Sequence, residues 1–95
     1  MADVLNADAL HHELDRLDSW EGTVQDGISR SYSFADFAGS IAFVNRLAAH
    51  AEQVGHHPDL AISWDTVTVT YITHSAGGVT EADLAQARAV DGLAE

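Results

Sequence analysis

Three of the chain's six histidines lie in one stretch, and their spacing is suited to proton transfer. His56 and His57 are followed directly by Pro58, and His74 stands just before a glycine-rich turn. Histidine has an unperturbed pKa of roughly 6.5, so it can give or take a proton near neutral pH. Three histidines beside a small pocket would provide general acid–base catalysis without a covalent intermediate.

The two adjacent histidines are poorly placed to share one ligand atom. Pro58 fixes its own φ and pushes His57 toward extended backbone, where neighbouring side chains diverge. Divergent rings can line two sides of a planar ligand. A metal site made of His56, His57, His74 and Glu52 is an alternative to acid–base catalysis. The divergence of the two adjacent rings and the lack of cysteine weigh against it.

Two carboxylates are candidates to orient the histidines. Glu52 lies one helical turn before His56, so the two would meet if the helix continues that far. Asp83 could accept the ring N–H of His74 and fix its tautomer. Each has an ordinary structural alternative, Glu52 as a solvated helix residue and Asp83 as part of a helix cap. Trp64 could likewise belong to the core of a sheet.

Length and composition narrow the class of protein. A chain of 95 residues predicts one domain over 1–95, with little room for a deep cleft unless a second subunit completes it. The net charge of −11 repels phosphate backbones and anionic lipids, so we expect no direct nucleic-acid or membrane partner. The absence of cysteine excludes disulfides and thiol nucleophiles. Without a signal-peptide pattern, we expect a cytoplasmic protein.

The first part of the chain reads as a helix followed by a hairpin. Leucines at helical spacing predict a helix over about 8–17. Strands are expected over 20–25 and 28–33, turning at Asp26-Gly27, a dipeptide that favours positive φ at both turn positions.

The longest predicted helix runs from Ser33 to about Val54. Ser33 and Asp36 match a capping pattern, and Gly55 is the expected end of the helix. Its apolar face is broad enough to serve both the core and a subunit contact. The side chains that form this face are Phe34, Phe37, Ile41, Phe43, Val44, Leu47, Ala48 and Ala51.

A second hairpin and a final helix complete the pattern. Strands are expected over 60–64 and 67–74 with a turn near Asp65-Thr66, and Thr80 is the expected cap of the last helix. The predicted fold class is α+β, with a four-stranded antiparallel sheet and three helices packed on one face, in the order α-β-β-α-β-β-α. The other face of the sheet would stay open to solvent, a ligand or a partner.

The same residues strongly resemble the signature of the pterin-4a-carbinolamine dehydratase family. That signature is an acidic residue, His-His-Pro after three residues, an aromatic residue, a histidine and an aspartate at the start of the last helix. In this chain the matching positions are Glu52, His56-His57-Pro58, Trp64, His74 and Asp83. The run from Thr73 to Thr80 and the pattern Arg30-x-x-x-Phe34-x-x-Phe37 are also similar, so the resemblance covers nearly the whole chain.

The resemblance implies a hydro-lyase that acts in tetrahydrobiopterin recycling. Such an enzyme dehydrates 4a-hydroxytetrahydropterin to quinonoid dihydropterin and needs no metal or organic cofactor. By the family pattern, His56 and His74 form the acid–base pair, and His57 joins them while it binds and orients the pterin. The remaining residues that the resemblance implies at the substrate site are Glu52, Thr73, Asp83 and Trp64.

The resemblance also raises points about affinity and partners. Leu60 and Ala61 stand where many members carry an aromatic residue that flanks the pterin, so stacking there would be weaker. The family forms dimers and tetramers, which implies a homodimer or homotetramer here. The alternative function is a non-catalytic binding or assembly factor of the same fold. Such a relative would be expected to lose some of the histidines, and this chain keeps all three.

Overall fold

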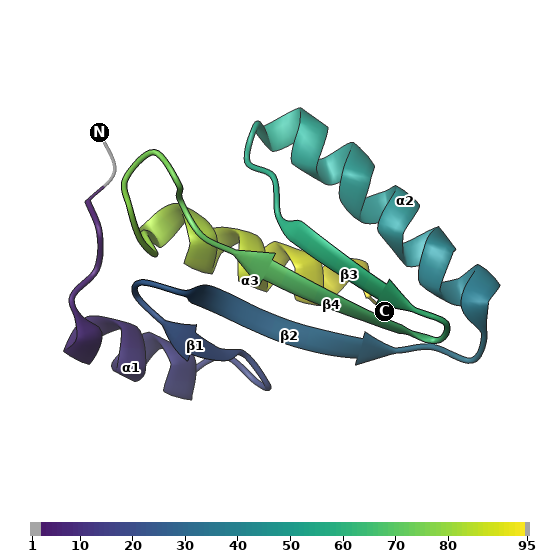
Figure 1. Cartoon of the computed structure of the whole chain (residues 1–95), viewed down its shortest axis with the longest axis horizontal. Coiled ribbons are helices and arrows are strands. Elements are labelled where there is room, and N and C mark those ends of the chain that lie inside the picture. The colour runs from purple at the N-terminus through teal and green to yellow at the C-terminus, as the bar shows by residue number, and fades with distance from the viewer. Residues whose placement is uncertain (1–2, 95) are drawn as a thin grey trace.

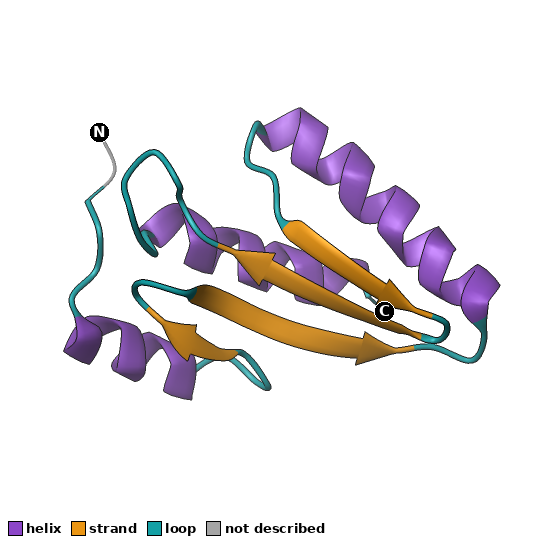
Figure 2. Cartoon of the chain, in the orientation of Figure 1, coloured by secondary structure: helices purple, strands orange, loops and turns teal. Residues whose placement is uncertain are grey.

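The computed structural model describes residues 3–94 and confirms the predicted α+β fold and element order. Figure 1 shows the arrangement of the elements, and Figure 2 separates helices from strands. The elements in chain order are α1 (Ala7–Asp15), β1 (Glu21–Thr23), β2 (Gly27–Ser33), α2 (Phe37–Val54), β3 (Asp59–Ser63), β4 (Thr66–Tyr71) and α3 (Glu81–Leu93). None of these helices has the length and apolar character needed to cross a membrane.

The four strands form one antiparallel sheet in the order β1-β2-β4-β3. Strand β4 lies inside the sheet, and its side chains alternate between buried and partly exposed positions. Val67, Val69 and Tyr71 face the helices and are fully buried. Helices α2 and α3 both contact β4, and α3 crosses behind the sheet in Figure 1. The core therefore lies between β4 and these two helices.

The two long helices bury one apolar stripe each, as their sequence periodicity predicts. The completely buried apolar side chains of α2 and α3 are Phe43, Leu47, Leu84, Ala87 and Val90. Full burial of a Leu, Val or Phe side chain contributes about 1.5–3 kcal/mol, so these stripes hold both helices on the sheet.

Helix α2 starts later than the sequence predicts and ends where it predicts. Ser33 is the last residue of β2 and pairs with Thr66 of β4, so it is not available as a helix cap. Asp36 is the cap, and its side chain accepts the backbone N–H of Gly39 at 2.7 Å. At the other end Gly55 adopts a left-handed conformation with φ of 72°, which turns the chain toward the sheet.

Both hairpin turns differ from the predicted ones. In the first hairpin Thr23 pairs with Gly27, so the loop between the strands has three residues. Of the predicted Asp26-Gly27 pair, only Gly27 has positive φ. In the second, Trp64 and Asp65 form the turn, and Trp64 has φ of 47°. The turns follow from the strand registers, β1 with β2 in the first hairpin and β3 with β4 in the second.

Candidate active site

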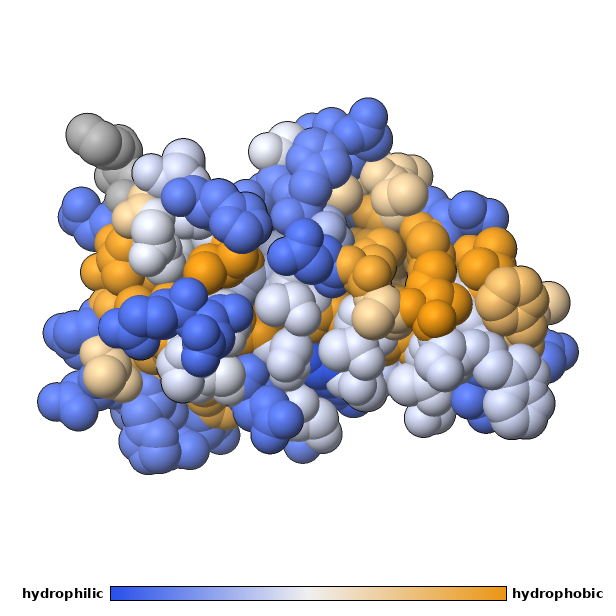
Figure 3. Space-filling model, viewed as in Figure 1, coloured by the Kyte–Doolittle hydropathy of each residue, from blue (hydrophilic) through white to orange (hydrophobic). Residues whose placement is uncertain are grey.

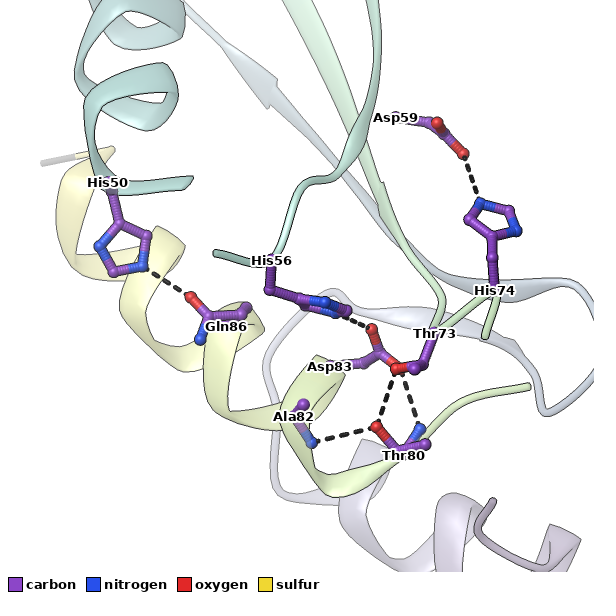
Figure 4. A network of polar contacts seen from close by, with 9 residues as sticks. All are labelled: His50, His56, Asp59, Thr73, His74, Thr80, Ala82, Asp83 and Gln86. Carbon is purple, nitrogen blue, oxygen red and sulfur yellow. Dashed lines mark hydrogen bonds and ion pairs between the residues drawn. The ribbon is translucent and has the colours of Figure 1, made fainter. Parts of the chain in front are cut away.

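His56 lies in the short segment that connects α2 to β3, two residues after the end of α2 and against the start of α3 (Figure 4). Its Nε2 lies 2.6 Å from Oδ1 of Asp83. The carboxylate of Asp83 is fully buried, whereas the side chain of His56 retains 21% of its exposure. Because an ionised carboxylate can only accept, Nε2 of His56 donates to Asp83. Nδ1 has no hydrogen-bond partner among residues 3–94.

The second oxygen of Asp83 is held by the start of α3. Oδ2 accepts the backbone N–H of Thr80 at 2.9 Å and the hydroxyl of Thr73 at 2.8 Å. Thr80 caps the helix in turn, and the predicted capping box of Thr80 and Asp83 is confirmed. A buried carboxylate is tolerated only when its oxygens are satisfied, and here both are. Asp83 is therefore a fixed acceptor aimed at His56.

His57 points away from His56 and meets a different carboxylate. Its Nε2 contacts Oε2 of Glu52, and both side chains are more than half exposed. The divergence of the two rings follows from the extended backbone before Pro58. Glu52 does not meet His56, because that contact required the helix to continue to His56, whereas α2 stops at Val54 and the chain turns.

His74 follows the last strand and faces outward toward β3 (Figure 4). Its Nε2 lies 3.9 Å from Oδ2 of Asp59, and both side chains are largely exposed. The expected pairing of His74 with Asp83 is wrong, since Asp83 is buried and already holds His56 and Thr73. Sequence reasoning missed Asp59 as a partner, although its position directly after Pro58 was an available signal.

Trp64 is the one predicted site residue that this chain does not bring to the histidines. It lies in the turn at the far end of the β3–β4 hairpin, and 68% of it is exposed. The length of β3 separates this turn from Asp59, a distance of about 17 Å at ~3.3 Å per residue. Thr73, by contrast, lies inside the site through its bond to Asp83.

Tyr71 belongs to the site although sequence reasoning placed it only in a strand. Its ring stacks on the imidazole of His56, with centroids 5.6 Å apart and planes 19° apart. Burial, and after it the charge of Asp83, raise the pKa of the Tyr71 hydroxyl to about 12. An aromatic residue close before His74 on the same strand was the signal that could have revealed it.

An apolar pocket of about 230 Å³ opens beside His57. Its walls come from the C-terminal half of α2 and from the start of β3, and Glu52 stands at its polar side. The lining residues are Leu47, Ala48, Ala51, Glu52, His57, Pro58 and Leu60. A flat ring compound with hydrogen-bonding edges would find apolar walls and one histidine–carboxylate pair here.

The chemistry of this region rests on histidines that are each paired with a separate carboxylate. The pairs are His56 with Asp83, His57 with Glu52 and His74 with Asp59. Over residues 3–94, no three histidine or acidic side chains converge as metal ligands would. A carboxylate on one ring nitrogen steadies the imidazolium that forms when the other nitrogen takes a proton, so such pairs suit reversible proton transfer.

Comparisons with known proteins agree on one family. The family model described as "Pterin 4 alpha carbinolamine dehydratase" matches residues 3–93. A relative from Thermosynechococcus vestitus, named "Putative pterin-4-alpha-carbinolamine dehydratase", is 47% identical over 94 residues, which are 99% of this chain and 98% of the relative. A relative of the same name from Rhizorhabdus wittichii is 41% identical over 100% of this chain and 95% of its own length.

Two solved structures share the fold. The crystal structure of a transcriptional coactivator/pterin dehydratase from Brucella melitensis has a TM-score of 0.90 and 34% identity, and the match covers 98% of this chain and 100% of that one. The structure of a pterin dehydratase-like protein identified as a RuBisCO assembly factor in the alpha-carboxysome has a TM-score of 0.65 and 28% identity. That match covers 80% of this chain and 90% of the other.

Proposed function

The chain belongs to the pterin 4 alpha carbinolamine dehydratase family, and we propose that it dehydrates 4a-hydroxytetrahydropterin by histidine general acid–base catalysis. The single observation that carries the proposal is the pairing of His56 with the buried carboxylate of Asp83. This pairing leaves Nδ1 of His56 available for proton transfer. The apolar pocket is lined by the neighbouring His57.

The reaction needs one acid and one base. The bond from C4a to the hydroxyl oxygen breaks, an acid protonates the departing oxygen, and water leaves. N5 loses its proton to a base as the C=N bond of quinonoid dihydropterin forms. One proton is given and one is taken, so the net charge of the enzyme does not change. Proton exchange, directly or through solvent, then restores the starting protonation state of each histidine.

Each histidine has a proposed role that follows from its surroundings. His56 and His74 are the acid–base pair, each able to serve a hydroxyl on one face of the pterin ring. His56 acts through Nδ1, because Asp83 occupies its other nitrogen. His57, steadied by Glu52, binds the pterin edge and supports proton transfer, and Thr73 and Asp83 hold His56 in place.

The pterin ring is proposed to bind against the pocket beside His57. Pro58 and Leu60 offer an apolar surface to the ring face, while Glu52 can accept hydrogen bonds from the amino groups of a pterin. Leu60 stacks on the pterin ring more weakly than an aromatic side chain would, so binding of the ring depends mainly on polar contacts.

A second copy of the chain is proposed to cover the apolar surface between α2 and β3. Figure 3 shows apolar side chains gathered where these two elements meet. The exposed large apolar side chains on them and on the adjoining turn are Phe37, Val54, Leu60, Ile62 and Trp64. Contiguous exposed apolar surface of this kind marks interaction sites, and a homodimer or homotetramer would bury it. Trp64 is proposed to contact substrate only within such an assembly.

The proposed cellular role is tetrahydrobiopterin recycling in the cytoplasm. Quinonoid dihydropterin is the oxidised product that a reductase must return to tetrahydropterin, so the reaction sits between a hydroxylating enzyme and a reductase. The likeness to a RuBisCO assembly factor supports the alternative, a non-catalytic factor of this fold.

One assay separates these functions. Freshly generated 4a-hydroxytetrahydropterin is mixed with the protein, and the appearance of quinonoid dihydropterin is followed beside His56→Ala, His74→Ala and the control His11→Ala. His11 is exposed, and its ion pair among residues 3–94 is with Asp15 of α1. We expect the protein to form quinonoid dihydropterin faster than the spontaneous reaction does. Both site variants should lose this acceleration, and the control should keep it. Folded protein that gives no acceleration over the spontaneous reaction would refute the dehydratase and favour the assembly factor.

A further inference from the structure

The ring of Tyr71 stacks on the face of the His56 imidazole, whereas Asp83 contacts its Nε2 edge. Tyr71 is the last residue of β4 and is completely buried. Its ring lies almost parallel to the imidazole of His56, with 5.6 Å between the centroids. The centroid of Trp20 lies 6.5 Å from that of Tyr71, inside the core. Tyr71 thus lies between the rigid core and the histidine proposed to transfer protons.

The hydroxyl group of Tyr71 does not explain why a tyrosine occupies this position. It is buried and has no hydrogen-bond partner among residues 3–94, which is unfavourable for a polar group. Burial, followed by the charge of Asp83, raises the pKa of this hydroxyl to about 12, so it stays protonated at neutral pH and transfers no proton. The useful part of Tyr71 is therefore its ring.

Two contacts together fix the imidazole of His56. The bond from Nε2 to Asp83 holds one edge of the ring and opens when the ring rotates about the Cβ–Cγ bond of His56. The stacked ring of Tyr71 lies on the face of the imidazole and blocks this rotation. We propose that Tyr71 is a positioning residue that keeps Nδ1 of His56 directed at the substrate. The proposal rests on the proposed function, in which His56 transfers a proton.

Three variants test this role. Tyr71→Phe keeps the ring and removes the unpartnered hydroxyl. Tyr71→Leu removes the ring. Phe43→Leu is the matched control, because Phe43 is a fully buried aromatic residue of α2 whose aromatic neighbours are Tyr32 and Phe34, not His56. Each folded variant is measured for kcat and KM, and the tautomer of His56 is read from two-bond ¹H–¹⁵N correlations of the ¹⁵N-labelled protein.

We expect Tyr71→Phe to match the original protein in both readouts. Tyr71→Leu should lower kcat about tenfold or more with KM little changed, since misplacing a catalytic group by ~1 Å costs up to about a hundredfold. The same variant should convert the single Nε2–H tautomer of His56 into an averaged mixture, while Phe43→Leu keeps the single tautomer and most of kcat.

Different results would overturn the positioning role of Tyr71 and the dehydratase activity. An unchanged tautomer and kcat in Tyr71→Leu, or equal losses in Tyr71→Leu and Phe43→Leu, would overturn the positioning role. If the unmodified protein shows no dehydration at all, the proposed function fails, and the tautomer of His56 in Tyr71→Leu still decides whether Tyr71 fixes the ring.

Discussion

The buried carboxylate of Asp83 lies 2.6 Å from Nε2 of His56 and is also the N3 residue of the α3 capping box. One side chain therefore starts a helix and orients a histidine. The helix fixes the carboxylate, since the backbone N–H of Thr80 and the hydroxyl of Thr73 hold the oxygen that does not face His56. The orientation of the proposed acid–base group depends on the geometry of a helix end.

Replacing Asp83 with asparagine should lower kcat about a hundredfold, because the neutral amide no longer steadies the imidazolium of His56. The steady-state rate of dehydration measures this effect. Thr80→Ala is the control, since it removes the capping hydroxyl and keeps both the carboxylate and the Thr80 backbone N–H that donates to it. We expect both variants to lose about 1–2 kcal/mol of folding free energy and only Asp83→Asn to lose most of its rate. Equal rates would contradict the role of Asp83.

Stability should fall as the pH rises from about 10 to 12. The folded-state pKa of Tyr71 is raised to about 12 from an ordinary value of 10.0, so the unfolded chain loses this proton first. The contribution is therefore fully present below pH 10 and is lost between pH 10 and 12. Urea unfolding at several alkaline pH values measures it. Tyr71→Phe should lessen this fall without abolishing it, because burial also raises the pKa of Tyr32. An equally steep fall in the variant would contradict the contribution of Tyr71.

Salt should stabilise the protein. The net charge is −11, and all four cationic side chains already bind partners, so like charges on the surface repel one another. These contacts are Arg16 with Glu13, Arg30 with Asp91, Arg46 with the carbonyl of Leu93, and Arg88 with Glu13.

Raising NaCl from about 0.02 M to about 0.5 M shortens the screening length and should raise Tm by a few degrees. Differential scanning fluorimetry provides the measurement. A Tm that does not rise over this range of NaCl would show that surface repulsion does not limit stability.

Replacing Leu60 with tryptophan should strengthen pterin binding. Leu60 lines the pocket beside His57, and an indole there can stack on a pterin ring, a gain of about 0.5–1.5 kcal/mol, or roughly two- to tenfold in KM. Ile62→Trp is the matched control, because Ile62 lies two residues along β3, is similarly exposed and does not line the pocket. Both positions lie on the surface proposed for a second copy, so the comparison uses variants that keep the oligomeric state of the original protein. A KM lowered equally by both changes would place the pterin elsewhere.

Local signals in the sequence predicted most of the fold. The element order, the end of α2 at Gly55 and the cap of α3 at Thr80 all depend on a few neighbouring residues, and all are confirmed. The predicted cap at Ser33 failed because β4 takes Ser33 into the sheet. Pairing between distant strands is a tertiary effect that a local pattern does not contain.

The sequence indicated which histidines to consider but assigned the wrong partners to them. Glu52 and Asp83 were matched with histidines by spacing along the chain. The left-handed turn at Gly55 moves His57, not His56, next to Glu52, and the packing of α3 on the sheet brings Asp83 beneath His56. Such pairings depend on the relative placement of elements and become visible only in three dimensions. The catalytic roles of these residues stay predictions.

The capping box of α3 also links the lifetime of the site to a fast local motion. The first turn of a helix opens and closes far more often than the whole protein unfolds. Whenever the turn that begins at Thr80 opens, Asp83 loses its anchor and His56 loses its acceptor. Hydrogen–deuterium exchange of the first-turn backbone amides therefore measures the fraction of time in which the site is disassembled, and the measurement needs no substrate.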